Sequence, residues 1–488
     1  MNARETTLLE ALPTGLYIDG KWVDGADGTF DVHDPATGEL LARVADASAQ
    51  DGLRALDAAA AAQRSWARTP PRERGEVLRR TWQLLEDRAE DFALLMTLEM
   101  GKPIAESRAE VAYGGEFLRW FAEEAVRISG RYGSAPEGRG LMTVSQRPVG
   151  PCYLVTPWNF PLAMATRKVA PAVAAGCTAV VKPAELTPLT TLALIGLLTD
   201  AGLPPGVVNV VTTTRPEPLS DALLSDRRLR KLSFTGSTRV GVSLLRKAAG
   251  NVLRTSMELG GNAPFVVFED ADLDRAVDGA VLAKFRNVGQ ACTAANRFLV
   301  HRSVADEFVA RLTDRVAALT VGRGTEDGVE IGPLVSARAV EGSARLVGDA
   351  VSRGAVVRTG GRAPAGPGHY FEPTLLDGVT AEMAVSAEEI FAPIVGVQRF
   401  DTEDEAVALA NATDFGLVGY VFTRDAQRGA RMMELIETGM LGLNVGAVSN
   451  AAAPFGGVKQ SGLGREGGAE GIGEYLETTY TLTPSPFG

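Results

Sequence analysis

Cysteine and histidine are scarce in this chain of 488 residues, which has three of each. The cysteines Cys152, Cys177 and Cys292 are too few and too far apart for a disulfide framework or a cysteine-ligated metal site. We therefore expect a reducing compartment and no metal. Long apolar runs are also missing, since the alanine run 58–62 is too short to span a membrane. Residues 1–16 alternate in charge without an apolar core, so we expect no signal peptide and a cytoplasmic protein.

Positive charge is in deficit. The 49 basic residues are outnumbered by 60 acidic ones, and the net charge of -11 argues against nucleic acid and anionic membranes as partners. An anionic substrate would therefore need local cations to attract it. A hydrophobic content of 45% and a charged content of 22% are typical of globular proteins, and the length favours two or three domains.

The chain changes its pattern after about residue 150. Before it, residues 17–23 indicate a hairpin with Asp-Gly at the turn, and helical spacing covers 71–100 and 104–126. After it, short apolar runs alternate with stretches long enough for crossover helices, which is the βαβ pattern of a parallel sheet that binds dinucleotides. These runs are 152–155, 178–181, 207–211 and 232–234.

A second α/β unit follows Gly261, with strands expected at 265–268, 298–300 and onward to about residue 420. Two stretches fit neither unit, the polar and Gly-rich 128–147 and the β-prone tail after residue 475. Long exposed strands of this kind often pair with another subunit.

Cys292 is the nucleophile candidate. It follows Gly-Gln-Ala after a predicted helix, in what we interpret as a loop that presents its side chain. Most isolated cysteines are small buried hydrophobic residues, and Cys152 and Cys177 fit that description because each leads into an apolar strand. Glu258 lies upstream, and a carboxylate can activate the water that releases a product from a thioester.

Glu258 enters the segment 259–262, Leu-Gly-Gly-Asn, which we interpret as a tight turn that holds the carboxylate at an interior site. The histidines His33, His301 and His369 are not near a nucleophile candidate in a loop-like setting. A Cys–His dyad therefore has little support.

The segment 234–241 is the candidate for phosphate binding. A strand ends there, Gly236 allows a turn, and Ser237 and Thr238 can cap the helix that begins. An ordinary strand-to-helix turn has the same composition, and the spacing to Gly241 is not the dinucleotide fingerprint.

Six motifs occur in a single order along the chain. They are Thr156-Pro-Trp-Asn-Phe-Pro161, Gly236-Ser-Thr238, Glu258-Leu-Gly-Gly261, Gly289-Gln-Ala-Cys292, Glu389-Ile-Phe391 and Pro454-Phe-Gly-Gly457. In this order and spacing they resemble the NAD(P)-dependent aldehyde dehydrogenase superfamily, from about residue 17 to residue 483.

This resemblance implies an α/β fold with two Rossmann-type parallel-sheet domains and a small β oligomerisation element. Residues 1–127 and 148–260 would form the cofactor-binding domain, 261–474 the catalytic domain, and 128–147 with 475–488 the oligomerisation element. It also implies a homodimer or homotetramer.

The resemblance also assigns catalytic roles. Cys292 would attack the aldehyde, and the side-chain amide of Asn159 with the backbone N–H of Cys292 would hold the oxyanion. Hydride transfer would leave a thioester, which water activated by Glu258 would hydrolyse. Lys168 and Glu466 match the positions of a proton relay behind that glutamate.

Further matches concern the cofactor. The matching positions are Thr156, Pro157, Trp158, Lys182, Glu185, Gly236, Ser237, Gly241, Leu259, Gly260, Glu389 and Phe391. Glu185 can accept hydrogen bonds from both ribose hydroxyls, and its charge repels a 2′-phosphate, so we expect NAD to be preferred while NADP stays possible.

Two arginines indicate which aldehyde is the substrate. Arg167 and Arg286 should face the substrate tunnel, where paired guanidinium groups suit a carboxylate. Among aldehyde dehydrogenases this pair is similar to that of succinate semialdehyde dehydrogenases, and Ser449 falls where those enzymes have a third carboxylate ligand. With Phe455, these residues form the expected substrate site. We expect a small aldehyde with a distal carboxylate, succinate semialdehyde first and glutarate semialdehyde or another short ω-oxo acid second.

Three alternatives stay open. A CoA-acylating aldehyde dehydrogenase typically lacks the glutamate found here at position 258. A cysteine hydrolase without a redox step would leave Lys182 and Glu185 without a purpose, and a crystallin-like binding protein would not need Cys292. The chain also departs from the family pattern at Ala294, where many succinate semialdehyde dehydrogenases have a second cysteine, and at Ala392, where the family has glycine.

Overall fold

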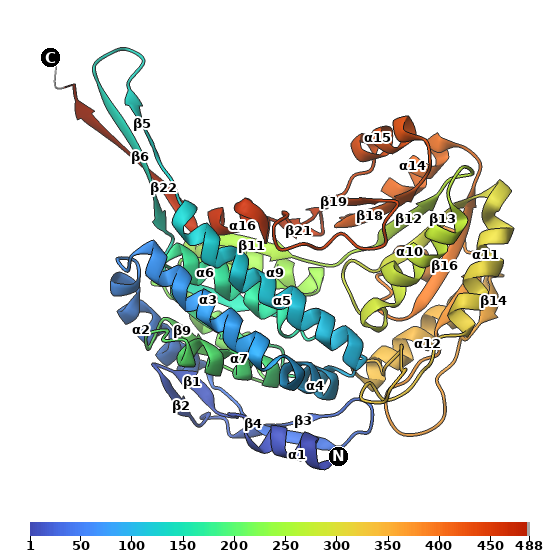
Figure 1. Cartoon of the computed structure of the whole chain (residues 1–488), viewed down its shortest axis with the longest axis horizontal. Coiled ribbons are helices and arrows are strands. Elements are labelled where there is room, and N and C mark those ends of the chain that lie inside the picture. Colours follow the sequence, from blue (N-terminus) through green and yellow to red (C-terminus); the bar gives the residue numbers. More distant parts are fainter. Residues whose placement is uncertain (486–488) are drawn as a thin grey trace.

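The chain folds into two α/β bodies that lie side by side, and a β arm projects from the first of them (Figure 1). This computed structural model describes residues 1–485. An eight-stranded sheet is the centre of the first body and a seven-stranded sheet the centre of the second, while the arm is a three-stranded sheet. The predicted fold class, α/β with parallel sheets, is confirmed.

The first sheet has a parallel centre. Its order is β2 (Lys21–Val23), β1 (Leu16–Ile18), β9 (Val208–Val210), β8 (Ala179–Lys182), β7 (Cys152–Val155), β10 (Lys231–Thr235), β11 (Arg254–Glu258) and β21 (Gly462–Leu463). The five strands from β9 to β11 in this order pair in parallel. Every residue of β7 and β8 is buried, because helices cover both faces of the sheet, and this explains the continuous apolar runs of the sequence. All four predicted strands are confirmed.

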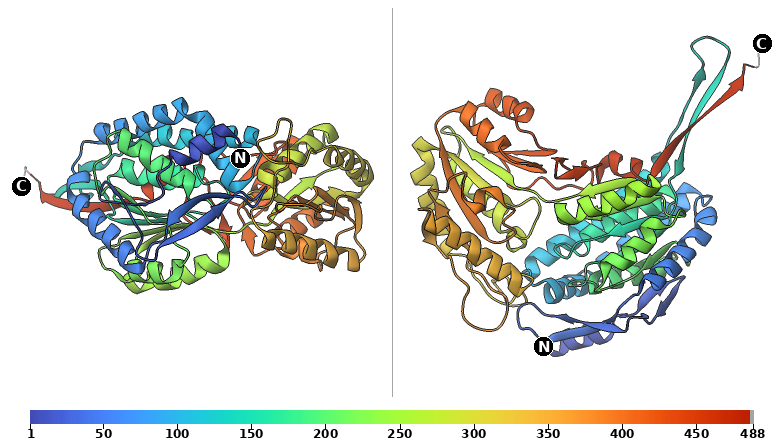
Figure 2. Two further views of the ribbon diagram at one scale, coloured as in Figure 1. Left: turned by 90° about the horizontal axis from the view of Figure 1, so that it is seen from below. Right: turned by 180° about the vertical axis from the view of Figure 1, so that it is seen from behind.

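Helices lie on both faces of this sheet (Figure 2). They are α2 (Ala49–Trp66), α3 (Pro71–Asp87), α4 (Ala89–Met100), α5 (Ile104–Glu124), α6 (Ala163–Ala175), α7 (Leu189–Asp200), α8 (Pro216–Ser225) and α9 (Thr238–Ala248). The continuous helical pattern of 71–100 is broken at Arg88, whose φ of -114° and ψ of 21° end α3 before α4 begins. A 3-10 turn, η1 (Ala125–Arg127), continues α5.

The second sheet is parallel except for one edge strand. Its order is β14 (Val356–Thr359), β15 (Thr374–Asp377), β16 (Ile394–Phe400), β13 (Ala295–His301), β12 (Ala263–Val267), β18 (Val418–Phe422) and β19 (Met440–Leu443). The sheet thus extends beyond the expected limit near residue 420. Its helices are α10 (Leu273–Phe285), α11 (Arg302–Ala317), α12 (Ala337–Ser352), α13 (Ala384–Ala387), α14 (Glu403–Asn411) and α15 (Ala426–Leu435).

The two stretches that fit neither unit pair with each other in the arm. Strands β5 (Arg131–Ser134), β6 (Gly140–Pro148) and β22 (Leu476–Pro484) form one antiparallel sheet that extends away from the body (Figure 2). The arm leaves Tyr132, Tyr480 and Leu482 exposed, at 72%, 57% and 52%. Residues 486–488 of the expected oligomerisation element lie outside the described residues.

Short elements complete the chain. They are α1 (Ala3–Glu10), β3 (Thr29–His33), β4 (Leu40–Ala45), a 3-10 turn η2 (Ala249–Asn251), β17 (Phe415–Gly416), β20 (Val458–Lys459) and α16 (Gly468–Gly473). The predicted hairpin at 17–23 is confirmed, since β1 and β2 pair across Asp19 and Gly20, which have positive φ values of 51° and 79°.

The segment 259–262 is not the predicted tight turn. Its four residues run without regular structure from β11 of the first sheet to β12 of the second. The chain therefore passes from the first body to the second at the Gly-Gly pair, and it does not reverse its direction within one body. Glu258, the last residue of β11, is buried at the start of this crossing.

No helix of residues 1–485 is long and apolar enough to cross a membrane. In the same part of the chain no group of three or more His, Cys, Asp or Glu residues is arranged to hold a metal ion.

Candidate active site

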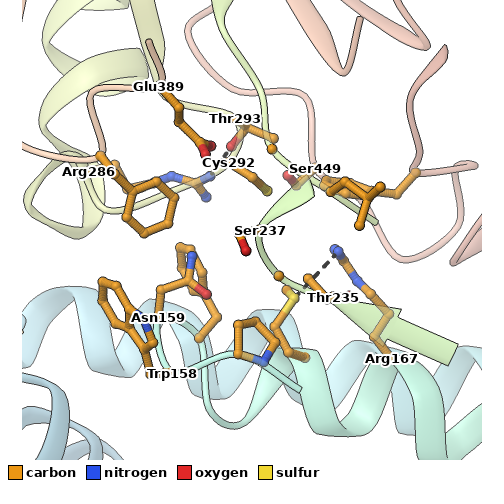
Figure 3. Close-up of a pocket in the computed structure, with 18 of the residues that line it drawn as sticks. Trp158, Asn159, Arg167, Thr235, Ser237, Arg286, Cys292, Thr293, Glu389 and Ser449 are labelled. Atoms are coloured by element: carbon orange, nitrogen blue, oxygen red, sulfur yellow. Dashed lines mark hydrogen bonds between the residues drawn. The ribbon is translucent and has the colours of Figure 1, made fainter. Parts of the chain in front are cut away.

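A cavity of about 220 Å³ is lined by residues from both bodies (Figure 3). We call it the Cys292 cavity. It brings together fourteen of the residues expected from the sequence, namely Pro157, Trp158, Asn159, Arg167, Gly236, Ser237, Leu259, Gly260, Arg286, Cys292, Glu389, Phe391, Ser449 and Phe455. The other expected residues are not among those that line the cavity, namely Thr156, Lys168, Lys182, Glu185, Gly241, Glu258 and Glu466.

Cys292 faces the cavity from the loop that follows α10 and a 3-10 turn, η3 (Arg286–Gly289). Burial raises the pKa of its thiol to about 12, and Glu389 adds to the rise while Arg167 opposes it. In the resting protein the nucleophile is therefore a neutral thiol at neutral pH, and it must lose its proton before it attacks a carbonyl. No histidine of the described chain lines the cavity, which agrees with the expected absence of a Cys–His dyad.

Asn159 lies on the wall opposite Cys292, in the segment after β7 (Figure 3). Its side-chain amide donates to the carbonyl of Gln290 at 2.9 Å, two residues before the nucleophile. Its backbone carbonyl accepts from Lys102 Nζ at 2.9 Å and from Asn287 Nδ2 at 3.0 Å. A primary amide has two N–H donors, so one remains for an oxygen atom in the cavity.

Glu258 is not among the residues that line the cavity, and it lies close enough to Glu466 for the two carboxyl groups to interact. Burial raises the pKa of its carboxyl well above the usual range, and the Glu466 carboxylate adds to the rise. One oxygen of each carboxyl group, Oε2, is buried without a hydrogen-bond partner. Glu466 forms a buried ion pair with Lys168, which also donates to Ser233 Oγ at 3.1 Å. The expected relay residues are thus adjacent.

The strand-to-helix segment at Gly236 presents its hydroxyl groups to the cavity. Ser237 has the N-cap position of α9, but its side chain forms no capping hydrogen bond, so the expected cap is not made by this hydroxyl. Gly241 lies one turn into α9, where a Cβ atom would come within 2.4 Å of Leu259 Cδ2. The glycine is therefore explained by close packing of Leu259 on the helix.

Glu389 and Phe391 also line the cavity. The rings of Phe391 and Trp158 meet edge to face with centroids 5.4 Å apart. Glu389 accepts a hydrogen bond from the N–H of Gly261 at 3.0 Å, and burial raises the pKa of its carboxyl to about 7. Phe391 itself has a positive φ of 49°, whereas Ala392 is not among the residues with positive φ. The methyl group of Ala392 is therefore compatible with this backbone.

Lys182 and Glu185 lie together at the carboxyl end of β8. Lys182 Nζ is 3.5 Å from Glu185 Oε2, and the Glu185 side chain is 46% exposed. Thr156, at the end of neighbouring β7, donates its N–H to the carbonyl of Lys182 at 3.1 Å. The carboxyl edge of a parallel sheet is where dinucleotides bind in folds of this kind.

The two arginines expected at the substrate site line the same cavity but differ in their surroundings. Arg167 is 1% exposed, donates to the phenol of Tyr113, and lies 4.0 Å from the ring centroid of Phe455. Its Nε is also 3.6 Å from Glu466 Oε2. Arg286 has one hydrogen bond, a long one of 3.3 Å to Thr293 Oγ1. Arg286 therefore has more donors free for a ligand.

The sequence model of the aldehyde dehydrogenase family matches residues 22–481. The chain belongs to the aldehyde dehydrogenase family. Among its relatives, a succinate-semialdehyde dehydrogenase of Paenarthrobacter nicotinovorans is 58% identical over 92% of this chain and 100% of its own. A glutarate-semialdehyde dehydrogenase of Pseudomonas aeruginosa is 48% identical over 95% and 96% of the two chains. The crystal structure of succinate-semialdehyde dehydrogenase from Burkholderia pseudomallei superposes with a TM-score of 0.96 at 47% identity, covering 98% of this chain and 99% of the other.

Membership in this family makes the protein an oxidoreductase that acts on small-molecule aldehydes with NAD or NADP. Cys292 is the only cysteine of its loop, because position 294 is alanine. The other two, Cys152 and Cys177, are fully buried in the first body, as expected. This aldehyde dehydrogenase therefore has no second thiol beside its nucleophile for a local disulfide.

Sequence reasoning missed five residues of the cavity wall, namely Tyr113, Phe160, Met164, Thr235 and Thr293. Phe160 stands in a recognised motif, and Thr293 follows the nucleophile directly, so both could have been named from their position alone. Tyr113 lies on α5, far from every motif, and only the packing of α5 against α6 brings it to the cavity.

Proposed function

We propose that this aldehyde dehydrogenase oxidises succinate semialdehyde to succinate, with NAD as the preferred hydride acceptor. The observation that carries the proposal is Arg286, a guanidinium group in the wall of the Cys292 cavity with only one long hydrogen bond of its own. Guanidinium groups bind carboxylates through two parallel hydrogen bonds. The similarity to succinate-semialdehyde dehydrogenases supports the same substrate.

The reaction begins at Cys292. After its thiol gives its proton to a water molecule, the thiolate attacks the aldehyde carbon, and the carbonyl oxygen becomes an oxyanion. The free N–H of the Asn159 amide and the backbone N–H of Cys292 stabilise this oxyanion. Arg286 meanwhile binds the distal carboxylate and fixes the aldehyde in the cavity. A nicotinamide dinucleotide, when bound, supplies the hydride acceptor that turns the thiohemiacetal into a thioester.

Glu258 then acts as the general base for hydrolysis. Its carboxylate takes a proton from water while the hydroxide adds to the thioester carbon and Cys292 leaves. To reach the cavity the side chain must turn from its place beside Glu466. The pair of Glu466 and Lys168 receives the proton from Glu258 afterwards. Hydrolysis by this route gives a free acid and not an acyl-CoA. We favour it over CoA acylation because CoA-acylating aldehyde dehydrogenases typically lack the glutamate found here at position 258.

The residues at the proposed cofactor site fit a dinucleotide. The hydroxyls of Thr156 and Thr235 are buried without a hydrogen-bond partner, as groups that await a ligand would be. A Cβ atom at Gly260 would lie 3.0 Å from Glu389 Oε2, so a larger residue there would crowd this carboxyl group. Lys182 and Glu185 would hold the adenosine ribose, Ser237 and Trp158 the pyrophosphate, and Glu389 with Phe391 the nicotinamide half.

Substrate preference tests the proposal. We expect kcat/KM for succinate semialdehyde to exceed that for butanal, an uncharged aldehyde of the same length, by about 10²-fold, because only the former can pair with Arg286. Initial rates of NADH formation measure both values, and analysis of the product identifies succinate. Equal values would contradict the proposed substrate. A higher value for glutarate semialdehyde would favour the second candidate, which a 48% identical relative supports.

Cofactor preference is a separate prediction. We expect kcat/KM for NAD to exceed that for NADP by about tenfold or more, because the Glu185 carboxylate repels the 2′-phosphate. Glu185→Gln removes the charge and keeps a hydrogen-bonding group, so it should narrow this ratio. A wild-type ratio near one, unchanged in Glu185→Gln, would show that Glu185 does not select the cofactor.

We also assign the arm to self-association. Its exposed Tyr132, Tyr480 and Leu482 lie on a sheet whose edges have no partner within the described chain, and such strands pair readily with another chain. A homodimer or homotetramer is therefore proposed, and sedimentation velocity distinguishes these from a monomer.

A further inference from the structure

The backbone just before the nucleophile has an uncommon conformation. Three successive residues are left-handed, Asn287 (φ 56°, ψ 32°), Val288 (φ 60°, ψ 26°) and Gly289 (φ 72°). Glycine and asparagine tolerate this region, but a β-branched residue such as valine rarely adopts it. Strained backbone of this kind persists only where the surrounding structure holds it, and it concentrates at functional sites.

Hydrogen bonds from inside and outside the turn hold it in place. The carboxylate of Glu106, on α5 of the first body, accepts a hydrogen bond from the N–H of Asn287. The side-chain oxygen of Gln290 accepts from the N–H of Val335 at 3.0 Å. The N–H of Gln290 donates to the carbonyl of Asn287 at 2.9 Å. The turn is therefore fixed both from the second body, which contains it, and from the first.

The side chain of Asn287 links this turn to Asn159. Its Nδ2 donates to the carbonyl of Asn159 at 3.0 Å and to the carbonyl of Gln290 at 2.9 Å. Since the amide of Asn159 also donates to Gln290 O, at 2.9 Å, both ends of Asn159 are tied to the segment before Cys292. These bonds fix the distance and angle between the amide and the nucleophile.

A buried ion pair holds Asn159 from the other side. Lys102 Nζ donates to the carbonyl of Asn159 at 2.9 Å and to Glu110 Oε2 at 2.5 Å, and both charged side chains are almost fully buried. The other oxygen of Glu110 accepts from the N–H groups of Leu162 and Ala163, each at 3.0 Å, where α6 begins. A protein in which such a buried ion pair is replaced by apolar residues is often as stable as the original. A gain in stability therefore does not explain why this pair is present.

We propose that Asn287 and Glu106, supported by the ion pair of Lys102 and Glu110, form a clamp that positions the Asn159 amide relative to Cys292. The four are positioning residues, because none of them needs to touch the reacting atoms. The clamp connects the first body to the second. It holds the loop of Asn159 against the loop of Cys292, although the two loops are far apart in the sequence. It rests on the proposed role of Asn159 in binding the oxyanion.

The test uses variants that remove side-chain contacts and keep the backbone. Asn287→Gly loses both side-chain hydrogen bonds, while glycine accepts the left-handed conformation. Asn444→Gly is the matched control, because Asn444 is also left-handed (φ 56°) and its side chain also forms two hydrogen bonds, both to the backbone of Thr423. It does not line the Cys292 cavity. Glu106→Ala removes the acceptor for the Asn287 N–H, and Glu106→Gln restores one.

Two rates are compared in the full-length protein. The first is the burst of NADH formed before steady state, which needs the oxyanion to be stabilised. The second is alkylation of Cys292 by iodoacetamide, which needs the thiolate but no oxyanion contact. We expect Asn287→Gly and Glu106→Ala to slow the burst by about tenfold to a hundredfold, as small misplacements at a reacting centre do. Alkylation should stay within about twofold, and Glu106→Gln and Asn444→Gly should match the wild type.

A double variant decides whether the effect passes through Asn159. In the Asn159→Ala background, Asn287→Gly should cause no further loss, because there is no amide left to position. A burst rate unchanged in Asn287→Gly, an equal slowing of alkylation, or the same additional loss in the Asn159→Ala background would each overturn the clamp. All measurements are repeated with propanal, so that a wrong assignment of succinate semialdehyde as substrate leaves this test intact.

Discussion

Glu258→Gln is expected to produce about one NADH per active site and then to stall. Glutamine cannot accept a proton from water, so the thioester on Cys292 forms at its normal rate but is hydrolysed slowly. Loss of a general base typically costs about 10²–10⁴-fold, and we expect a decrease of this size in kcat. Stopped-flow absorbance of NADH measures the burst and the steady state in one experiment.

Hydroxylamine provides the control. It is a stronger nucleophile than water and needs less help from a base, so it should restore turnover in Glu258→Gln and yield the hydroxamate. A variant without a burst would show that Glu258 acts before thioester formation. A variant with normal kcat would remove Glu258 from the mechanism.

The surroundings of Glu258 make the rate of thioester hydrolysis depend on pH. Burial and the nearby Glu466 raise the pKa of its carboxyl. The carboxyl must be ionised to act as a base, so hydrolysis of the thioester should be slow below this raised pKa and should accelerate as the pH rises through it. In Glu258→Gln the steady-state rate of NADH formation should not show this rise with pH.

Arg286→Ala is expected to lower kcat/KM for succinate semialdehyde by about 10²–10³-fold, mainly through KM, and to leave kcat/KM for butanal within about twofold. The guanidinium group is the freer of the two arginines in the cavity, and truncating one partner of a desolvated charge pair commonly has an effect of this size. Rates of NADH formation over a range of both aldehydes measure it.

Arg286→Lys is the matched variant for this prediction. It keeps the positive charge but loses the planar pair of donors, so its kcat/KM should lie between those of the wild type and Arg286→Ala. Equal losses on both aldehydes in Arg286→Ala would mean that Arg286 supports the loop of Cys292 and does not bind the carboxylate. The same comparison with Arg167→Ala is less specific, because Arg167 also contacts Tyr113 and Glu466.

The sequence predicted those parts of the fold and site that depend on local patterns. Buried parallel strands such as β7 and β8 are short apolar runs, and the segment before Cys292 is typical of a loop that presents its side chain. By contrast, the crossing at 259–262 was misinterpreted, because a Gly-Gly pair is equally typical of a tight turn. The change of unit expected after Gly261 separates β11 from β12, but it does not show that the chain passes between the two sheets without a tight turn.

Contacts between distant segments could not be predicted. Lys102, Glu106 and Glu110 belong to no motif, yet in the fold Lys102 and Glu110 are buried and meet the backbone of Asn159 and the start of α6. The raised pKa of Glu258 is another case, since part of the rise comes from Glu466, more than two hundred residues later. Such arrangements follow from tertiary packing and carry no periodic signal.

The most direct test of the covalent route is mass spectrometry of Glu258→Gln quenched after the NADH burst with succinate semialdehyde and NAD. We predict that the peptide containing Cys292 carries one succinyl group, bound as a thioester that hydroxylamine removes. A burst of NADH with Cys292 unmodified, or with the succinyl group on another residue, would contradict the account.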